Sequence, residues 1–346
     1  MKHQTTRYGE IPFYKIGTFG NTADAFISKK LFLEYKTKYS FPKKGDILIS
    51  ASGTIGRAVI YDGKPAYFQD SNIVWIDNDE TLVKNDFLFY AYSNVKWNTE
   101  HTTILRLYND NFRNTLIPLP PLNEQSAIAN ILSGLDRYLC ALRALILKKE
   151  GVKKALSFEL LSQRKRLKGF NQAWQRVRLG DIANYLTSNL SAEQITQQGK
   201  IKVYDVNNFI GYTDTTFISD KPYISIVKDG SVGRVRILPP KTNILSTMGA
   251  LIANHRTTTE FLFYLLSNFD FKNFTSGSII PHIYFKDYKE KTIFLPPLNE
   301  QIAIANILSD LDNEIASLKN KKRQFENIKK ALNHDLMSAK IRVLEK

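Results

Sequence analysis

The sequence contains a single cysteine, Cys140, among its 346 residues, so no disulfide can form within the chain. Its five histidines are scattered, and none stands at metal-ligand spacing with a cysteine or a carboxylate. No apolar run approaches the roughly 20 residues of a membrane-spanning helix, and the opening MKHQTTRYGE has no apolar signal segment. These absences predict a cytoplasmic protein with no membrane segment and no metal site of its own.

Catalytic signatures are missing as well. The sequence has no Walker loop, no GxGxxG or HExxH motif and no Pro-Pro-Tyr methyltransferase signature. No Ser/His/Asp set and no nuclease-like cluster of carboxylates and lysine stands out. We therefore expect a protein that is not an enzyme and holds no cofactor, but binds and positions while chemistry is done elsewhere.

Acidic residues are scarce beside basic ones. The sequence has 33 Asp and Glu against 48 Lys and Arg, a net charge of +15. A basic excess of this size favours a polyanionic partner, nucleic acid first of all. A soluble basic protein without such a partner would show the same balance, so charge alone leaves both possibilities open.

One phrase occurs twice. Leu119–Ser133 and Leu295–Ser309 differ only at Ser126 and Ile302, at an offset of 176 residues (295 − 119). A repeat of this length marks one architectural unit used twice. Similar segments flank the phrase: Phe87–Asn94 with Phe261–Asn268, Gly53–Ile60 with Gly230–Ile237, and Val152–Leu156 with Ile328–Leu332. The offset is constant in the C-terminal part of each unit and drifts towards Gly9 and Gly199, which suggests a constant frame carrying two different heads.

The constant part is predicted to be a long helix that starts after the paired prolines Pro120-Pro121. Apolar residues follow at alternating spacings of four and three, the pattern of a heptad seam. The seam positions are Ile128, Leu132, Leu135, Leu139 and Leu142 in the first copy, and Ile304, Leu308, Leu311, Ile315 and Leu318 in the second. We expect the two helices to pair as an antiparallel coiled coil, with a slip in the heptad phase between Phe325 and Ile328. The lysines and arginines near the helix ends fit a solvated face, DNA phosphates or an acidic protein surface equally well.

The variable parts are predicted to be mixed α/β heads. Short apolar or alternating runs bounded by Gly, Pro and Asp are typical of strands. The runs are Gly45–Ser50, Arg57–Tyr61, Asn72–Ile76, Tyr223–Val227 and Gly233–Leu238. Asp86–Lys96 and Thr259–Phe269 are predicted helices with aromatic side chains facing a core. The fold class is therefore α+β, with two repeated units of a head followed by a long helix.

A Gly-x-x-Gly-Arg turn recurs in both heads, and its polar residues are candidate DNA contacts. They are Ser52, Thr54 and Arg57 in the first copy, and Ser231 and Arg234 in the second. Glycines permit a tight loop, and backbone amides with an arginine can hold a phosphate. A hairpin turn that only connects two strands explains the motif as well.

A second pair of corresponding stretches is Ile104–Tyr108 and Ile280–Tyr284. Arg106 and His282 occupy the same place but differ, and Tyr108 matches Tyr284. Different donors in equivalent loops are what two heads reading different bases would need. Ordinary loop variation is the alternative.

The duplicated LPPLNEQxAIANILSxLD, the following helix with its KKAL segment and the preceding GxxGR turn together resemble the specificity subunit of Type I restriction-modification systems. The lead-in Trp174–Ile182 is similar to the start of a target-recognition domain in that family. The resemblance covers nearly the whole chain and both repeats.

The resemblance implies that each head reads one half of a bipartite, asymmetric site in double-stranded DNA. The paired helices would space the heads and dock two modification (methyltransferase) subunits. Restriction (helicase-nuclease) subunits would complete the complex. S-adenosylmethionine, ATP and Mg²⁺ would be used by those partners, with no cofactor in this chain. The implied domains are a first target-recognition domain at 1–117, a spacer helix at 118–168, a second target-recognition domain at 169–293 and a second spacer helix at 294–346.

One departure is that the first unit has no counterpart of the Trp174–Ile182 lead-in, so the N-terminal segment of its head is expected to be missing. A truncated subunit, or a recombination cassette completed by rearrangement, would explain this. Three other classes remain open: an autonomous sequence-specific DNA-binding protein such as a repressor, an enzyme, and a scaffold that pairs proteins through its coiled coil.

Overall fold

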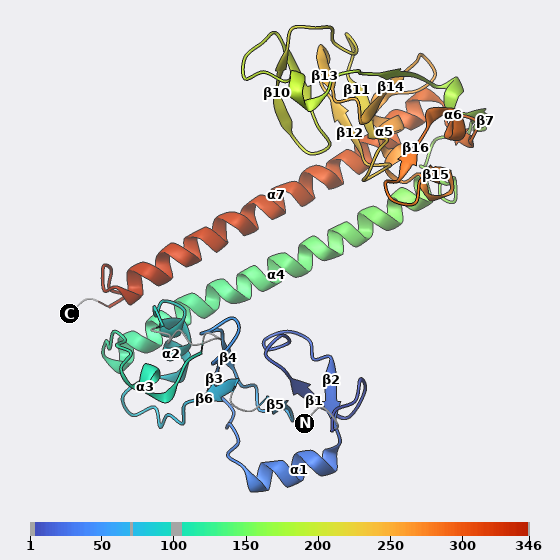
Figure 1. Cartoon of the computed structure of the whole chain (residues 1–346). Coiled ribbons are helices and arrows are strands. Elements are labelled where there is room, and N and C mark those ends of the chain that lie inside the picture. Colours follow the sequence, from blue (N-terminus) through green and yellow to red (C-terminus); the bar gives the residue numbers. More distant parts are fainter. Residues whose placement is uncertain (1–3, 70–71, 98–105, 345–346) are drawn as a thin grey trace. The chain divides into compact units, whose positions relative to one another are not determined.

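The structure is a computed structural model that describes residues 4–69, 72–97 and 106–344 (Figure 1). The chain divides into two compact units. Unit 1 comprises Met1–Arg143 and Asn320–Lys346, and unit 2 comprises Ala144–Lys319. Each unit therefore contains one head together with one segment of each long helix.

The head of unit 1 has two three-stranded sheets, ordered β2-β1-β5 and β4-β3-β6. Its strands are β1 (Ile11–Tyr14), β2 (Ala25–Ile27), β3 (Ile47–Ser50), β4 (Ala58–Ile60), β5 (Tyr67–Phe68) and β6 (Ile73–Trp75). Its helices are α1 (Lys29–Lys38), α2 (Asn85–Tyr92) and α3 (Asn109–Arg113). The aromatic face of α2 is buried against β3, as the sequence predicted.

The head of unit 2 repeats this plan and adds to it. Its main sheets are ordered β10-β9-β13 and β12-β11-β14-β8, with two-stranded sheets β17-β7 and β15-β16 beside them. The strands are β7 (Gln175–Arg178), β8 (Ala183–Thr187), β9 (Ile201–Tyr204), β10 (Phe209–Thr213), β11 (Tyr223–Val227), β12 (Val235–Leu238), β13 (Thr242–Ile244), β14 (Met248–Ala253), β15 (Thr275–Ser276), β16 (His282–Ile283) and β17 (Thr292–Leu295). The helices are α5 (Thr259–Ser267) and α6 (Phe285–Tyr288), with 3-10 turns at Leu179–Asp181, Ala192–Gln194 and Lys272–Phe274.

The two heads share strand order and direction. β1 pairs antiparallel with β2 and parallel with β5, and β9 pairs in the same way with β10 and β13. The drifting offset has a physical cause, because unit 1 has longer connections before β3 and one of them folds into α1. The predicted strands and both predicted head helices are confirmed, each within a few residues of its expected limits.

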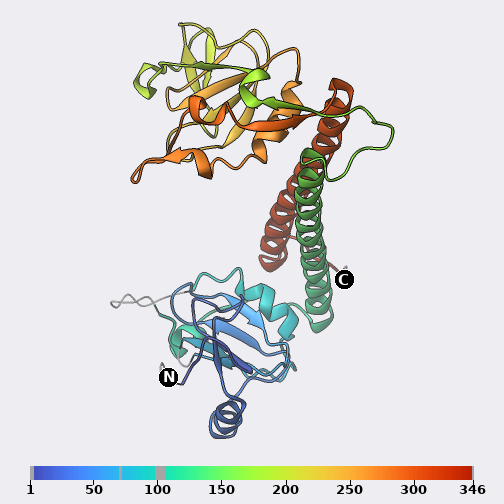
Figure 2. The ribbon, with the colours of Figure 1, turned by 90° about the vertical axis from the view of Figure 1, so that its right-hand side faces the viewer.

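The long helices are α4 (Leu122–Leu161) and α7 (Leu298–Met337), and each begins directly after its paired prolines. A segment of α4 lies beside a segment of α7 in each unit, and their ion pairs show that the two run antiparallel (Figures 1 and 2). In unit 2 Lys149 Nζ lies 2.8 Å from a carboxylate oxygen of Glu314, and Lys153 Nζ lies 2.5 Å from one of Asp312. In unit 1 the rings of Tyr138 and Phe325 lie 4.8 Å apart.

The predicted seam faces inward. Ile128, Leu132, Leu139, Leu142, Ile304, Leu308 and Ile315 are buried, and Leu135, Leu311 and Leu318 are half-buried. The predicted slip after Phe325 is wrong, because Ile328 is 50% exposed and the next seam position belongs to Lys329. Lys329 Nζ lies 2.5 Å from Asp136 Oδ1 and over the ring of Tyr90, so a paired lysine continues the heptad.

The same device occurs in unit 2 at the repeat offset. Lys153 corresponds to Lys329 (153 + 176), and Asp312 corresponds to Asp136 (136 + 176). Tyr264 donates a hydrogen bond of 2.9 Å to Asp312, as Tyr90 does at 2.8 Å to Asp136. Burial and the bond to that carboxylate raise the pKa of the Tyr264 hydroxyl. Each lysine at the seam is therefore held by an aspartate and a tyrosine.

The repeated Asn-Glu-Gln phrase joins each head to its long helix. In unit 1 the side-chain oxygen of Gln125 accepts a hydrogen bond from the Lys84 amide at 2.8 Å. Its Nε2 donates to the carbonyls of Leu82 at 3.1 Å and Pro120 at 2.8 Å. A buried glutamine is expected to satisfy its polar atoms in this way, and the bonds pin the helix start to the segment before α2.

The glutamate before it accepts an arginine from the other long helix or the residues that follow it. In unit 1 Arg342 binds Glu124 through Nε at 3.3 Å and Nη2 at 2.7 Å. In unit 2 Arg166 binds Glu300 at 3.1 and 2.6 Å, and Trp174 Nε1 donates to Glu300 at 2.9 Å. The hydrogen bonds from Arg342 lower the pKa of the Glu124 carboxyl. The phrase is repeated because both units use it for the same two connections.

Candidate nucleic-acid interface

The Gly-x-x-Gly turn links β3 to β4 in unit 1 and β11 to β12 in unit 2. Gly53 and Gly56 have φ of +67° and +79°, and Gly230 and Gly233 have φ of +81° and +80°. Side chains rarely adopt this left-handed conformation, which accounts for the glycines. A Cβ at Gly56 would lie 2.2 Å from the indole nitrogen of Trp97, so the turn also packs closely on a ring behind it.

The amides of the turn are used within the head. The Ile55 amide bonds the Gly53 carbonyl and the Gly56 amide bonds the Ser50 carbonyl, both at 3.0 Å. In unit 2 the Gly233 amide bonds the Val227 carbonyl at 2.9 Å. These amides cannot also hold a phosphate, so a contact here would come from side chains. Thr54 and Ser231 are exposed at the tips of the two turns.

The structure brings the second predicted stretch against the turn in each head. Ser52 forms a β-bridge with Arg106, and the Leu107 amide bonds the Ala51 carbonyl at 2.9 Å. Ile104 lies outside the described residues, as does Leu105. We name the site formed by Ala51–Arg57 and Arg106–Tyr108 the turn face of unit 1.

The turn face of unit 2 is formed by Lys228–Arg234 and His282–Tyr284. Asp229 forms a β-bridge with His282, and the Ile283 amide bonds the Lys228 carbonyl at 2.9 Å. The two stretches were separate candidates in the sequence, and the fold makes them one surface in each unit.

The two turn faces carry different side chains at matching places. In unit 1 Ser52 Oγ donates to Asn72 Oδ1 at 2.8 Å, and the Arg106 guanidinium lies 6.0 Å from the ring centre of Tyr108. In unit 2 His282 Nδ1 lies 2.7 Å from Asp229 Oδ1. The side chains on the two faces therefore offer different hydrogen-bonding patterns.

The aromatic partners remain accessible. Tyr108 is 42% exposed and Tyr284 is 50% exposed. Lys286 Nζ lies 5.5 Å from the ring centre of Tyr284, which places a cation beside that ring. Tyrosine and basic side chains at one surface suit stacking on bases and attraction to phosphates.

The turn arginines are tied to their own heads. Arg57 Nη1 donates to the Phe19 carbonyl at 3.0 Å, and Arg234 Nη2 donates to Asn207 Oδ1 at 2.9 Å. Each bond links the sheet that carries the turn to a loop of the other sheet. Both arginines are still exposed, so part of each guanidinium faces solvent.

Several residues of these surfaces escaped the sequence analysis. Asp229 could have been found, because it precedes Gly230 and aligns with Ser52 at the offset of 177 (229 − 52). Asn207 accepts from Arg234 and, through its carbonyl, from Arg236 at 2.9 Å, but no motif marks it. The guanidinium of Arg236 also lies 5.2 Å from the ring centre of Tyr204.

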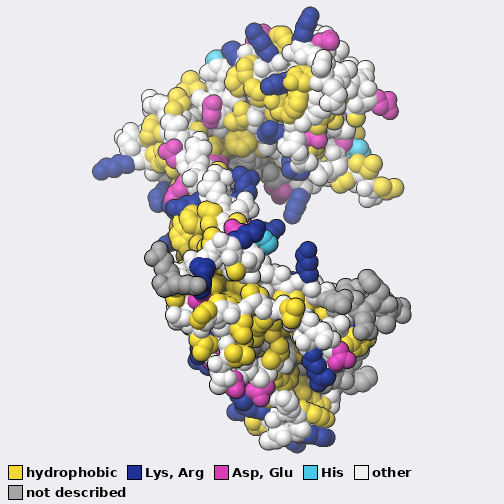
Figure 3. All heavy atoms as spheres, turned by 90° about the vertical axis from the view of Figure 1, so that its left-hand side faces the viewer, with side chains coloured by type: hydrophobic (Ala, Val, Ile, Leu, Met, Phe, Trp, Pro, Cys, Tyr) yellow, Lys and Arg dark blue, Asp and Glu magenta, His cyan; other side chains and the backbone are white. Residues whose placement is uncertain are grey.

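Basic side chains are spread over the surface instead of forming one patch. On the face shown in Figure 3, Lys and Arg occur on both heads, with exposed apolar side chains between them. Many helix lysines are paired within their own unit, for example Lys319 with Glu150 at 2.6 Å. The +15 charge therefore does not by itself locate a binding surface.

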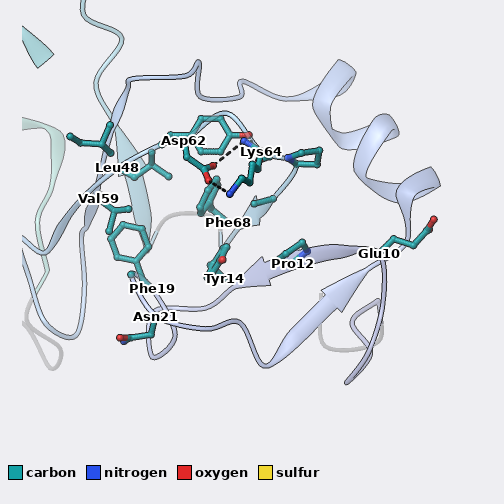
Figure 4. Close-up of a pocket in the computed structure, with 15 residues that line it drawn as sticks. Glu10, Pro12, Tyr14, Phe19, Asn21, Leu48, Val59, Asp62, Lys64 and Phe68 are labelled. Carbon is teal, nitrogen blue, oxygen red and sulfur yellow. Dashed lines mark hydrogen bonds and ion pairs between the residues drawn. The ribbon is translucent and has the colours of Figure 1, made fainter. Parts of the chain in front are cut away.

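A hollow of about 600 Å³ opens between the two sheets of unit 1 (Figure 4). Tyr14, Phe19, Val59 and Phe68 line it with apolar surface. Its one bonded polar pair in Figure 4 is Asp62 with Lys64, which are both exposed. Ligand sites combine apolar walls with convergent polar groups, and this hollow offers few.

Among the residues that the structure describes, no group of histidine, cysteine and carboxylate side chains could hold a metal ion. Within the same residues, no helix has both the length and the apolar character needed to cross a bilayer.

Comparison with known proteins identifies the fold and the family. The model of the Type I restriction modification DNA specificity domain matches residues 1–149 and again residues 171–327. A crystal structure of a Type-I restriction-modification system S subunit from M. genitalium superposes with a TM-score of 0.64 at 20% identity, covering 97% of this chain and 91% of that one. At this identity the likeness shows the fold alone.

Curated relatives agree. A putative type I restriction enzyme specificity subunit of Haemophilus influenzae is 65% identical over 137 residues, which is 39% of this chain and 36% of that protein. The chain thus matches about a third of that relative. A putative type I restriction enzyme specificity subunit of Methanocaldococcus jannaschii is 28% identical over 335 residues, 86% of this chain and 79% of that protein.

The family assignment and the α+β architecture with two repeated units are confirmed. The family is that of the specificity subunit, the non-catalytic component of its system. The chain belongs to the Type I restriction modification DNA specificity domain family and carries the domain of that family twice.

Proposed function

We propose that this chain is the DNA sequence-specificity subunit of a Type I restriction-modification complex and binds a bipartite, asymmetric site in double-stranded DNA. Each head is assigned one half of the site. The observation that carries the proposal is the pair of turn faces, built on the same backbone plan but with Arg106 at one and His282 with Asp229 at the other. One scaffold with two sets of donors suits two different half-sites.

The proposed DNA contacts divide by chemistry. Arg57 and Arg234, with Ser52, Thr54 and Ser231, are assigned to phosphates, since they lie on exposed or half-exposed turn positions. Arg106 and His282 are assigned to base edges, with Tyr108 and Tyr284 stacking beside them. Phosphate contacts supply affinity and base contacts supply selectivity.

The remaining parts of the proposal concern the complex. Heads at 1–117 and 169–293 are proposed as target-recognition domains, and the helices at 118–168 and 294–346 as spacers that dock two modification subunits. Restriction subunits complete the complex in the cytoplasm. S-adenosylmethionine, ATP and Mg²⁺ are used by these partners.

A head exchange tests the function. The chain is expressed with a modification subunit, and methylated sites are mapped across the genome. Replacing residues 1–117 with the head of another family member should change one half of the methylated sequence, and replacing residues 169–293 should change the other half. A change in both halves after one exchange would contradict the assignment of one half-site to each head.

Point variants test the residues. Arg106→Ala and His282→Ala should each relax selectivity at one half-site only, by about 1–3 kcal/mol per lost base contact. Arg137→Ala, on the exposed side of α4, is the control. Tight and selective DNA binding by the purified chain alone would favour an autonomous DNA-binding protein instead.

A further inference from the structure

Unit 1 has open positions where unit 2 is complete. In unit 2, Trp174–Thr187 supplies β7, a 3-10 turn and β8. β8 pairs along the edge of β14, with Leu251 opposite Tyr185, and β7 pairs with β17. In the described part of unit 1, the sheet that matches β12-β11-β14-β8 ends at β6, and no strand corresponds to β7 or β8.

The first open position is a cavity where unit 2 has Trp174. Trp174 is 8% exposed, packs in one cluster with Leu160, Leu295 and Ile304, and donates its indole N–H to Glu300. The residues of unit 1 at the same offset of 176 are Leu336, Leu119, Ile128 and Glu124. These residues line a cavity of about 340 Å³.

The exposure of one matched leucine shows the difference. Leu295 is 4% exposed in unit 2, where β7 and Trp174 cover it. Leu119 is 48% exposed in unit 1. Burying a leucine side chain contributes roughly 1.5–3 kcal/mol, so a segment that covers Leu119 would be held by apolar contact.

The second open position is a cavity where unit 2 has Tyr185. The ring of Tyr185 stacks on Phe285 with centres 4.6 Å apart, and a Cβ at Gly249 would meet its hydroxyl at 2.3 Å. Phe285 corresponds to Asn109, and Gly249 corresponds to Val74 through the strand registers. Asn109 and Val74 line a cavity of about 400 Å³ beside the free edge of β6.

We propose that unit 1 binds an extended segment of a separate polypeptide that has the pattern of Trp174–Tyr185. The tryptophan of the segment fills the cavity at Leu119 and bonds Glu124. Its first strand pairs with residues 116–119, and its second strand pairs with β6 and places a tyrosine over Val74. Strand addition to a free sheet edge is a common mode of peptide recognition, since backbone hydrogen bonds give affinity and side-chain pockets give selectivity.

A second copy of this chain is a poor donor of that segment. Leu179 and Ile182 have no exposed surface, so the segment of one copy could leave its own head only by opening the core of unit 2. A separate polypeptide has no such cost. The inference goes beyond the proposed function and holds whether or not unit 1 reads DNA.

The test uses the whole chain and a labelled synthetic peptide with the sequence of residues 172–189. Fluorescence anisotropy should show saturable binding of this peptide. A peptide with Trp174→Ala and Tyr185→Ala keeps every charge and should bind at least tenfold more weakly. Hydrogen exchange of the complex should show new protection at residues 73–76 and 116–119.

Matched variants of the chain locate the site. Leu119→Glu should weaken peptide binding at least tenfold, and Leu33→Glu on α1, where the leucine is 52% exposed, should leave it unchanged. Equal binding of the two peptides, or protection confined to other residues, would overturn the proposal. Sedimentation that shows a dimer dissolved by the peptide would make a second copy the occupant and would also overturn it.

Discussion

The buried glutamine at the start of α7 gives a quantitative prediction. Gln301 has no exposed surface and makes four hydrogen bonds. Its oxygen accepts from the Thr257 hydroxyl at 2.9 Å and the Thr258 amide at 3.1 Å, and its Nε2 donates to the carbonyls of Arg256 at 3.0 Å and Pro296 at 2.8 Å. Gln301→Leu keeps the volume and removes all four bonds.

The cost follows from which groups can reach water. An unsatisfied buried polar group costs about 1–3 kcal/mol. The bonds to Thr257 and Pro296 are buried, while those to Thr258 and Arg256 are partly accessible and should cost less. We expect Gln301→Leu to lower the unfolding free energy of unit 2 by about 4 kcal/mol. The matching Gln125→Leu should cost unit 1 about 2 kcal/mol, since its three bonds are all partly accessible.

Tryptophan fluorescence during urea unfolding can separate the units. Trp174 lies in unit 2, and Trp75 and Trp97 lie in unit 1. In a Trp75→Phe, Trp97→Phe background the signal reports unit 2 alone. Gln197→Leu, at an exposed position, is the control. If Gln301→Leu moved the unit 2 transition no further than Gln197→Leu, the assigned role of the repeated glutamine would be refuted.

Two more predictions concern the seam and alkaline pH. Leu308→Asp puts a charge at a seam position with no exposed surface and should lower the melting temperature of unit 2 strongly, whereas Asn306→Asp on the exposed side of α7 should not; equal melting of both variants in calorimetry would contradict the seam. Burial raises the pKa of Tyr223 to about 12, so the folded state resists ionisation of this hydroxyl. Its contribution is present below the unfolded pKa of about 10 and is lost as pH rises towards 12, a decline of roughly 2 kcal/mol that Tyr223→Phe should reduce and that urea titrations at pH 9 and 12 can measure.

The elements that local pattern determines could be predicted. Strands such as Tyr223–Val227 and the helix after Pro296-Pro297 are set by short-range alternation, heptad spacing and proline, all visible in the sequence. Comparing the two copies added further information, because matching residues such as Leu132 and Leu308 identify the same buried position twice.

Features that depend on tertiary partners could not be predicted. Lys329 interrupts the apolar pattern, so its seam position was assigned to a phase slip, and only the contact with Asp136 reveals its place. The role of Glu300 also depends on Arg166 and Trp174, which lie far from it in sequence. The turn arginines were assigned from sequence to phosphate alone, and their bonds within each head became apparent from the fold.

The lysines at the seam have a consequence for folding specificity. If α4 and α7 slid past each other by one heptad, Lys153 would face apolar residues of the other helix and lose Asp312. A polar residue at a seam position can select a single alignment of two helices at a cost in stability. Two such locks, Lys153 with Asp312 and Lys329 with Asp136, discriminate against misaligned and parallel pairings that the leucines alone would tolerate.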